Sequence, residues 1–323
     1  MMNFIGEDYK EFADPRYCPL GMYVSDPTDP KVGTYTLDDS YIVRAAMEIE
    51  PTLSTKAINE LKMLLSVFAP IVCTNRDPYL IAVKNGIFND KTKKLMDFSP
   101  ELVFLTKCPV AFVENAPLPV IDDDRCEGGT WDVESWMSDL NDNPQVVDTL
   151  WDILAAAIRP NRAWNKAPFL YATRGCNGKG TYCTLLQNLV GANAVCSMNL
   201  EQMNNPSYLE GIVGASLIYG DENDVGRYID GSSNFKSLVT GDTVAVNRKY
   251  EKVVRMGFSG LIVQNCNEKP RMRDRTDSLA RRILLVPFDK NFLGAENKDI
   301  KGDYLRRPEV LEYVLSRVLM RQI

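Results

Sequence analysis

The sequence contains no histidine, and this absence excludes whole classes of chemistry. Serine–histidine–aspartate and cysteine–histidine nucleophilic sites, histidine metal sites and histidine general bases all require the imidazole ring. Eight cysteines are present but no two are arranged as CxxC, so a zinc cluster is not expected. We interpret the cysteines as small buried side chains in a reducing compartment. Any catalysis must therefore use carboxylates, lysine, arginine, backbone amides or a bound metal ion.

Long apolar runs and an N-terminal targeting signal are also missing. No segment approaches the ~20 apolar residues that a membrane-spanning helix needs, and the first residues carry no basic and apolar signal pattern. With 45% hydrophobic and 25% charged residues, the composition is that of an ordinary globular protein. We therefore expect a cytoplasmic protein that does not contact a membrane.

Basic residues are in the minority overall, since the formal net charge is −6, but the charges are segregated. Residues 236–282 contain eleven basic residues against five acidic ones, and residues 122–142 contain eight acidic residues against one basic residue. We interpret the acidic stretch as a solvated linker, because acids without histidine or basic neighbours make a poor metal site. Whether the protein binds nucleic acid therefore depends on this local basic patch and not on the total charge.

A glycine-rich turn lies within residues 169–182. The sequence runs from the apolar FLYA through TRGCNGKGT into an apolar-periodic segment, which predicts a strand, a phosphate-binding loop and a helix. Such a loop directs backbone N–H groups at a polyphosphate, and the Lys179 ammonium would reach its β- and γ-phosphates. The match to GxxxxGK followed by Ser or Thr is incomplete, because Thr173 replaces the first glycine and Gly180 replaces the Mg²⁺-binding hydroxyl. A glycine-rich turn without a ligand is the structural alternative.

Two further apolar strands are predicted to end in polar side chains. The run at 212–219 leads into Asp221 and Glu222, and a strand at 260–264 leads into Asn267. A carboxylate pair at a strand end suits Mg²⁺ binding and activation of a water molecule, and an amide suits contact with a γ-phosphate. Ordinary strand-end turns are the alternative for both.

Basic side chains gather in two later places. Arg281 and Arg282 precede another apolar strand, where an arginine could stabilise transition-state charge in a neighbouring subunit. The alternating stretch 241–256 is expected to be a hairpin whose middle suits a nucleic-acid backbone and a stacked base. The residues concerned are Arg248, Lys249, Tyr250 and Lys252. Surface arginines and a solvated hairpin are the corresponding alternatives.

In this order, the motifs resemble those of the superfamily 3 helicases, the AAA+ family of small DNA viruses, poxviruses and phages. The similarity is greatest to the phage and plasmid (poxvirus-type) primase-helicase branch and covers about residues 167–288, with a looser similarity of residues 79–100 to the family's pre-ATPase domain. The resemblance implies ATP and Mg²⁺ as cofactors, with Thr181 and Asp221 as metal ligands. The implied nucleotide-binding residues are Gly175, Cys176, Asn177, Gly178, Lys179, Gly180 and Thr181.

The resemblance also implies catalytic and DNA-binding roles. The catalytic residues would be Lys179, Asp221, Glu222, Asn267 and either Arg281 or Arg282. Arg248, Lys249, Tyr250 and Lys252 would bind single-stranded DNA in a central pore. A homo-oligomeric ring, expected to be a hexamer, would act with other replication proteins in the cytoplasm of a bacterial host. Gly180 departs from the family pattern, so Thr181 or water would complete the metal shell, and nothing in the chain matches a primase.

We therefore expect an α/β fold, with an AAA+ P-loop ATPase core and a mostly parallel sheet in residues 143–290. A smaller α+β domain is expected in residues 1–142, and residues 291–323 would begin a C-terminal helical segment whose truncation is left open. The expected function is ATP-dependent DNA unwinding in phage or mobile-element DNA replication. Two alternatives share the ATPase residues: an AAA+ remodeller or loader without unwinding activity, and a DNA-binding replication module with a vestigial ATPase.

Overall fold

The structure is a computed structural model that describes residues 2–4, 20–223, 233–247, 254–268 and 278–323. The chain divides into two compact units, one formed by Met1–Asp77 with Met96–Lys107 and the other by Pro78–Leu95 with Cys108–Ile323. Each unit has a buried apolar cluster of its own. The domain boundaries expected after residues 142 and 290 stay predictions.

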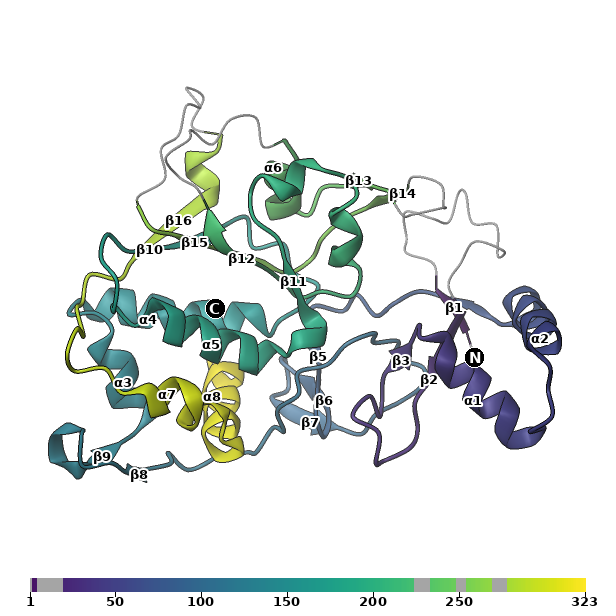
Figure 1. Ribbon diagram of the computed structural model, residues 1–323, viewed down its shortest axis with the longest axis horizontal. Helices are drawn as coiled ribbons and strands as arrows, with labels where there is room; N and C mark the ends of the chain where they lie inside the picture. Colours follow the sequence, from purple (N-terminus) through teal and green to yellow (C-terminus); the bar gives the residue numbers. More distant parts are fainter. Residues whose placement is uncertain (1, 5–19, 224–232, 248–253, 269–277) are drawn as a thin grey trace. The chain divides into compact units, whose positions relative to one another are not determined.

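The first unit is a small α+β body (Figure 1). Its four-stranded sheet has the order β3-β2-β1-β4. Polar caps fix the starts of its two helices, because Asp38 accepts a hydrogen bond from Ser40 N and Ser54 accepts one from Ala57 N. The elements are β1 (Met2–Phe4), β2 (Leu20–Tyr23), β3 (Tyr35–Thr36), α1 (Asp39–Ile49), α2 (Thr55–Phe68) and β4 (Ile71–Val72).

The second unit is built around a five-stranded sheet with the order β11-β12-β15-β10-β16 (Figure 1). All neighbouring strands are parallel. A parallel sheet needs crossover connections, and the carboxyl ends of its strands meet at one edge. The observed sheet confirms the predicted α/β class. The strands are β10 (Ala167–Tyr171), β11 (Val195–Ser197), β12 (Leu217–Asn223), β15 (Leu261–Cys266) and β16 (Ile283–Pro287).

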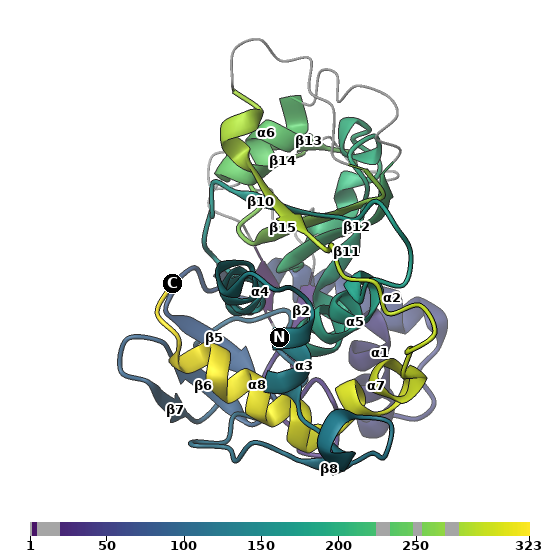
Figure 2. The same ribbon diagram turned by 90° about the vertical axis from the view of Figure 1, so that its left-hand side faces the viewer.

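Structural elements cover both faces of this sheet. Leu170 belongs to one buried cluster and its neighbour Phe169 to the other, because successive side chains of a strand point to opposite faces. The Leu170 face packs against α4 (Pro144–Ala157) and α5 (Lys179–Val190), and α8 (Pro308–Met320) packs against these two helices. The Phe169 face packs against α6 (Ser233–Thr240) and β13 (Val244–Val246), which pairs with β14 (Val254–Met256). Figures 1 and 2 show these two layers on opposite sides of the sheet.

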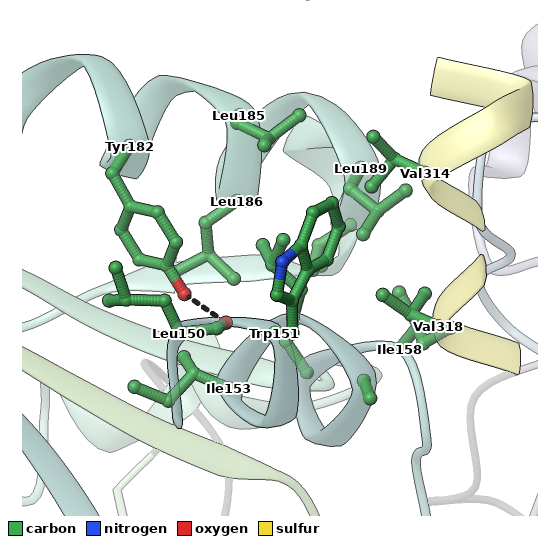
Figure 3. Packing of buried hydrophobic residues seen from close by; sticks show 14 of the residues in the cluster. Leu150, Trp151, Ile153, Ile158, Tyr182, Leu185, Leu186, Leu189, Val314 and Val318 are labelled. Carbon is green, nitrogen blue, oxygen red and sulfur yellow. Dashed lines mark hydrogen bonds between the residues drawn. The ribbon is translucent and has the colours of Figure 1, made fainter. Parts of the chain in front are cut away.

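The helices on the Leu170 face are locked together by apolar packing and one buried hydrogen bond. Tyr182 on α5 is fully buried and donates its hydroxyl to the carbonyl of Leu150 on α4 at 2.8 Å (Figure 3). Val314 and Val318 bring α8 into the same cluster. At the start of α4, Asn143 accepts a hydrogen bond from Gln145 N, and proline occupies the first helical position, where its missing N–H costs no hydrogen bond.

The acidic stretch 122–142 is structured, so its interpretation as a solvated linker was wrong. Asp123 is only 6% exposed. Its carboxylate accepts hydrogen bonds from Arg125, Asn297 and Tyr304. A buried carboxylate needs such partners, and two of them, Asn297 and Tyr304, come close to Asp123 only in the folded chain. The stretch holds β8 (Ile121–Asp122), β9 (Thr130–Trp131) and α3 (Val133–Asp139).

The remaining elements of the second unit are short. A three-stranded sheet contains β5 (Leu80–Val83), β6 (Gly86–Asn89) and β7 (Lys94–Met96), and helix α7 spans Lys298–Gly302. Among the described residues, every helix is too short or too polar to cross a membrane.

Candidate nucleotide-binding site

The predicted phosphate loop connects β10 to α5, as the sequence indicated. Gly178 precedes α5 with a φ of +82°, a left-handed conformation that favours glycine. A Cβ atom at Gly178 would lie 2.5 Å from Leu140 Cδ2, so space also requires glycine here. Asn177 is buried and accepts a hydrogen bond from Lys179 N at 3.0 Å, while its amide donates to the Arg174 carbonyl. The loop therefore has a fixed shape that ends at a helix N-terminus, where backbone N–H groups attract anions.

A later segment of the chain lies against the phosphate loop. Phe292 N donates to the Cys176 carbonyl at 2.7 Å, and the Phe292 ring lies beside Gly178. A hydrogen bond between the Cys176 thiol and the Glu296 carboxylate raises the pKa of Cys176, so the thiol keeps its proton. Cys176 is exposed, so the interpretation of the cysteines as buried side chains was wrong at this position.

Lys179 reaches the end of the neighbouring strand β15. Its ammonium donates to the Cys266 carbonyl at 2.7 Å and lies 3.5 Å from Asn267 Oδ1. Because β10 and β15 are adjacent and parallel, the loop after one strand and the residues after the other share one edge of the sheet. The structure thus brings the predicted residues Lys179 and Asn267 together.

Asp221 stands on β12, next to β15, with an exposed side chain. Tyr219 donates its hydroxyl to Asp221 Oδ1 at 2.8 Å. Asn265 Nδ2 donates to the Tyr219 oxygen at 2.6 Å and lies 3.4 Å from Asp221 Oδ1. Burial raises the pKa of Tyr219, so the hydroxyl keeps the proton that it donates. Sequence analysis missed Tyr219 and Asn265; the period of two that puts Tyr219 and Asp221 on one face of a strand was the available signal.

Asp221 lies in a β-bulge of β12. Gly220 pairs with Gln264 and Asn223 pairs with Cys266, so β12 has one residue more than β15 in this interval. Asn223 therefore donates to Gln264 Oε1 at 2.9 Å and takes no part in the contacts of Asp221 described above. The backbone of Glu222 lies in the bulge, but its side chain lies outside the described part of the chain.

Gly180 and Thr181 occupy the first turn of α5. The backbone does not require glycine at 180, because its φ is not in the left-handed region. A Cβ atom there would have one described atom within 4 Å, the Lys301 ammonium at 4.0 Å. Thr181 is half-buried. The local backbone would therefore accept a residue with a side chain at position 180, and it does not explain why the hydroxyl is missing there.

Arg281 and Arg282 lie at the opposite end of the sheet from the phosphate loop. They belong to the short helix η7 (Ala280–Arg282), and the next residue, Ile283, pairs with Ala167 at the start of β10. The loop leaves β10 at its other end, roughly 13 Å away for a strand of this length. The structure therefore does not bring the paired arginines to Lys179 of the same chain.

The two arginines differ in their surroundings. The side chain of Arg281 is exposed, whereas that of Arg282 donates to the Ser278 carbonyl at 2.5 Å. The Nε atom of Arg282 is buried and has no hydrogen-bond partner among the described residues.

The predicted DNA-binding residues Arg248, Lys249, Tyr250 and Lys252 lie outside the described residues. The strands that flank them are described: Val244 pairs with Met256 and Val246 with Val254 in antiparallel register. The hairpin predicted for residues 241–256 is confirmed for these strands.

Two family models match separate parts of the chain. A model described as "D5 N terminal like" matches residues 31–142, which include all of residues 79–100, the region compared above with a pre-ATPase domain. A family of unknown function, DUF5906, matches residues 170–282, which include the loop, Asp221, Asn267 and the paired arginines.

Solved structures of the NrS-1 C-terminal region share the fold. Its A-form apo structure aligns with a TM-score of 0.54 and 14% identity over 85% of this chain and 59% of that chain. Another apo structure of this region aligns with a TM-score of 0.52 and 15% identity over 88% and 63%. This chain thus spans about three fifths of the length of those proteins. A JCV helicase bound to a small molecule aligns at 19% identity over 56% and 52%, but its TM-score of 0.38 is too low to establish a shared fold.

Proposed function

We propose that this protein is an ATP-dependent DNA helicase that assembles as a ring and translocates on DNA during replication of a phage or mobile element. One observation carries the proposal: the ends of β10, β12 and β15 meet at one edge of a parallel sheet, with Lys179 beside Asn267 and Asp221 beside Asn265. Ligands of open α/β sheets bind at this edge. The D5 N terminal like match and the NrS-1 fold support the assignment.

The residues at this edge fit a nucleoside triphosphate with Mg²⁺. The exposed Asp221 carboxylate and the Thr181 hydroxyl are oxygen ligands of the kind that Mg²⁺ prefers. Backbone N–H groups of residues 175–181 would hold the phosphates, and Lys179 would contribute a cation. A bound Mg²⁺ would neutralise part of the phosphate charge. Because Gly180 has no hydroxyl, Thr181 or water would fill the remaining ligand position.

In the proposed hydrolysis, Glu222 would accept a proton from the water that attacks the γ-phosphorus. The bond between that phosphorus and the oxygen linking the β- and γ-phosphates breaks, which yields ADP and phosphate. Lys179 would neutralise charge on the phosphates, and Asn267 would contact the γ-phosphate. Lys179 would exchange its hydrogen bond to the Cys266 carbonyl for bonds to phosphate oxygens.

The position of the paired arginines supports assembly into a ring. Because they lie at the far end of β10 and β16, an arginine would reach the phosphates only from a neighbouring copy. A contact in which different surfaces of identical subunits meet repeats around an axis, and it forms a ring when the rotation between neighbours closes and an open filament when it does not. We propose a hexamer, with Arg281 as the contributing arginine because its side chain is exposed.

The proposed DNA contacts come from the hairpin between β13 and β14. Its sequence places Arg248, Lys249, Tyr250 and Lys252 together, and we propose that these residues bind single-stranded DNA in the pore. Lysine and arginine would contact phosphates while the tyrosine ring stacks on a base.

Gly180 favours one competing function, a DNA-binding replication module with a vestigial ATPase. ATP hydrolysis with and without single-stranded DNA separates the two. We expect DNA to stimulate hydrolysis, and Lys179→Ala to lower the rate by about 10²-fold or more, because it removes a cation from the transition state. Hydrolysis that DNA does not affect would indicate a remodeller or loader, and no hydrolysis by an assembled ring at saturating Mg²⁺ would favour the vestigial ATPase.

A further inference from the structure

Asp221 is the carboxylate proposed above to bind Mg²⁺, and one of its two oxygens is already held by protein groups. We propose that Tyr219 and Asn265 are positioning residues that fix the Asp221 carboxylate so that its second oxygen faces the divalent cation. This inference rests on the proposed function, since it concerns the same nucleotide site.

The direction of each hydrogen bond follows from the chemistry of the donors. Asn265 Nδ2 is a donor only, so at 2.6 Å from the Tyr219 oxygen it must donate to it. The hydroxyl proton of Tyr219 is then directed at Asp221 Oδ1, 2.8 Å away. Asn265 Nδ2 lies 3.4 Å from the same oxygen. Both groups engage Oδ1, which leaves Oδ2 for another ligand.

The two positioning residues are themselves held firmly. Asn265 is 3% exposed and Tyr219 is 5% exposed. Asn265 lies in β15, which pairs with β10 on one side and β12 on the other, and its amide group contacts Cys183 Sγ on α5 at 3.4 Å. The network therefore joins a helix that begins in the phosphate loop to the strand that carries Asp221.

The bulge in β12 separates this network from the other polar side chains nearby. Asn223 bonds to Gln264 Oε1 and to the Asn265 carbonyl, and Gln264 Nε2 donates to the Met198 carbonyl. Gln264 fills the space above Gly220, where a Cβ atom would lie 2.1 Å from its Oε1. Neither amide side chain thus competes for the Asp221 carboxylate in the contacts described.

An oriented carboxylate binds a cation more tightly than a rotating one, because the loss of rotational freedom has already occurred. Hydrogen-bond partners of metal-binding groups typically change metal affinity by roughly 10- to 100-fold when they are removed. The hydroxyl of Tyr219 is the stronger of the two donors by distance, so its removal should have the larger effect.

The test is the affinity for Mn²⁺, measured by electron paramagnetic resonance, in the presence of a non-hydrolysable ATP analogue. Tyr219→Phe should weaken Mn²⁺ binding by about 10-fold or more. Binding of the analogue in EDTA should stay unchanged, because the phosphate loop is untouched. Tyr182→Phe is the matched control: its hydroxyl is also buried and bonded at 2.8 Å, but to the Leu150 carbonyl (Figure 3). It should lower the melting temperature without changing Mn²⁺ affinity.

Wild-type Mn²⁺ affinity in folded Tyr219→Phe would overturn the inference. If that variant does not fold, Asn265→Ala tests the second donor in the same assay, and unchanged affinity there is equally contradictory. A different result would contradict the proposed function itself. In that case the wild-type protein would bind the analogue no more tightly with Mn²⁺ than without it, and Asp221 would have no role in metal binding.

Discussion

Arg281 and Arg282 are adjacent in sequence but differ in what their side chains touch. We expect Arg281→Ala to lower hydrolysis by about 10³-fold or more, because an arginine supplied by a neighbour stabilises transition-state charge. Arg282→Ala should act mainly on stability, since its side chain is tied to the Ser278 carbonyl. Mixing Arg281→Ala with Lys179→Ala subunits checks this. Mixed rings should regain activity, because some interfaces combine an intact lysine with an intact arginine; rings that stay inactive would argue against the shared site.

Single candidate residues can be selected from the sequence where chemistry and order along the chain suggest them. Lys179, Asp221 and Asn267 follow three apolar segments, and their residue types suggest a triphosphate site before any geometry is known. Tyr219 and Asn265 could not be identified in this way, because a tyrosine or asparagine at a strand end is ordinary. Their role depends on which strands are neighbours, and β12 and β15 are separated by more than thirty residues of chain.

The phosphate loop and α5 form one element whose shape depends on Gly178. Gly178→Ala would place a methyl group 2.5 Å from Leu140 Cδ2 in a left-handed backbone position. Gly128→Ala is the matched control, because Gly128 has a φ of +83° and no described atom within 4 Å of the new Cβ. The control should cost about 1 kcal/mol of unfolding free energy from backbone strain alone. Gly178→Ala should cost a further ~1–3 kcal/mol from overpacking. Chemical denaturation measures both, and equal losses would contradict the packing role of Leu140.

Elements were predictable where local signals agree with packing. The cap at Asn143 and Pro144 and the strand before the phosphate loop are examples, because a capping side chain or a buried apolar run needs no distant partner to be recognised. The stretch around Asp123 was misjudged for the opposite reason. Its partners Asn297 and Tyr304 lie far along the chain, and nothing near Asp123 in sequence reveals them.

A buried ion pair between Arg159 and Asp90 connects distant parts of the chain within the second unit. Arg159 is 1% exposed and donates to both oxygens of Asp90, at 3.1 and 3.0 Å. The same guanidinium donates to the carbonyls of Val318, Leu319 and Arg321 at the end of α8. A cation at the carboxyl end of a helix is also favoured by the helix dipole. The pair therefore joins the β5–β6 hairpin, α4 and the C-terminal helix.

Removal of the Arg159 side chain should destabilise the fold more than removal of the Arg162 side chain. Arg162 binds the same carboxylate at 3.1 Å, but from a more exposed position. We expect Arg159→Ala to lower the unfolding free energy by about 3–5 kcal/mol, because Asp90 would be left buried without its main partner. Arg162→Ala should lower it by about 1 kcal/mol or less. Denaturant titration compares the two variants, and similar losses would show that Arg159 is not the principal contact.

The same pair predicts a dependence of stability on pH. Burial raises the pKa of Asp90, but hydrogen bonds from Arg159 and Lys93 outweigh this effect and hold its pKa below the usual range. A carboxylate with a lowered folded pKa stabilises the protein above its unfolded pKa of about 3.9. That contribution is lost as the pH falls through the lower folded pKa. Asp90→Asn should therefore show a shallower loss of unfolding free energy in this acidic range than the wild-type protein.

The arrangement of the whole molecule was the least accessible from sequence. That Arg281 and Arg282 lie at the far end of β10 follows from strand order and direction, which no local pattern of residues specifies. Because of this placement, the proposed site needs the arginine of one subunit and the phosphate loop of its neighbour.

Calorimetric titration of a non-hydrolysable ATP analogue with Mg²⁺ tests whether the loop at Lys179 holds a nucleoside triphosphate. The comparison needs the wild-type protein, Lys179→Ala and Lys166→Ala, an exposed lysine just before β10 that serves as the control. We expect the wild-type protein and Lys166→Ala to bind alike, and Lys179→Ala to bind at least about 10-fold more weakly, since it loses a hydrogen-bonded charge contact. Equal binding by all three proteins would place the nucleotide elsewhere and contradict the proposed site.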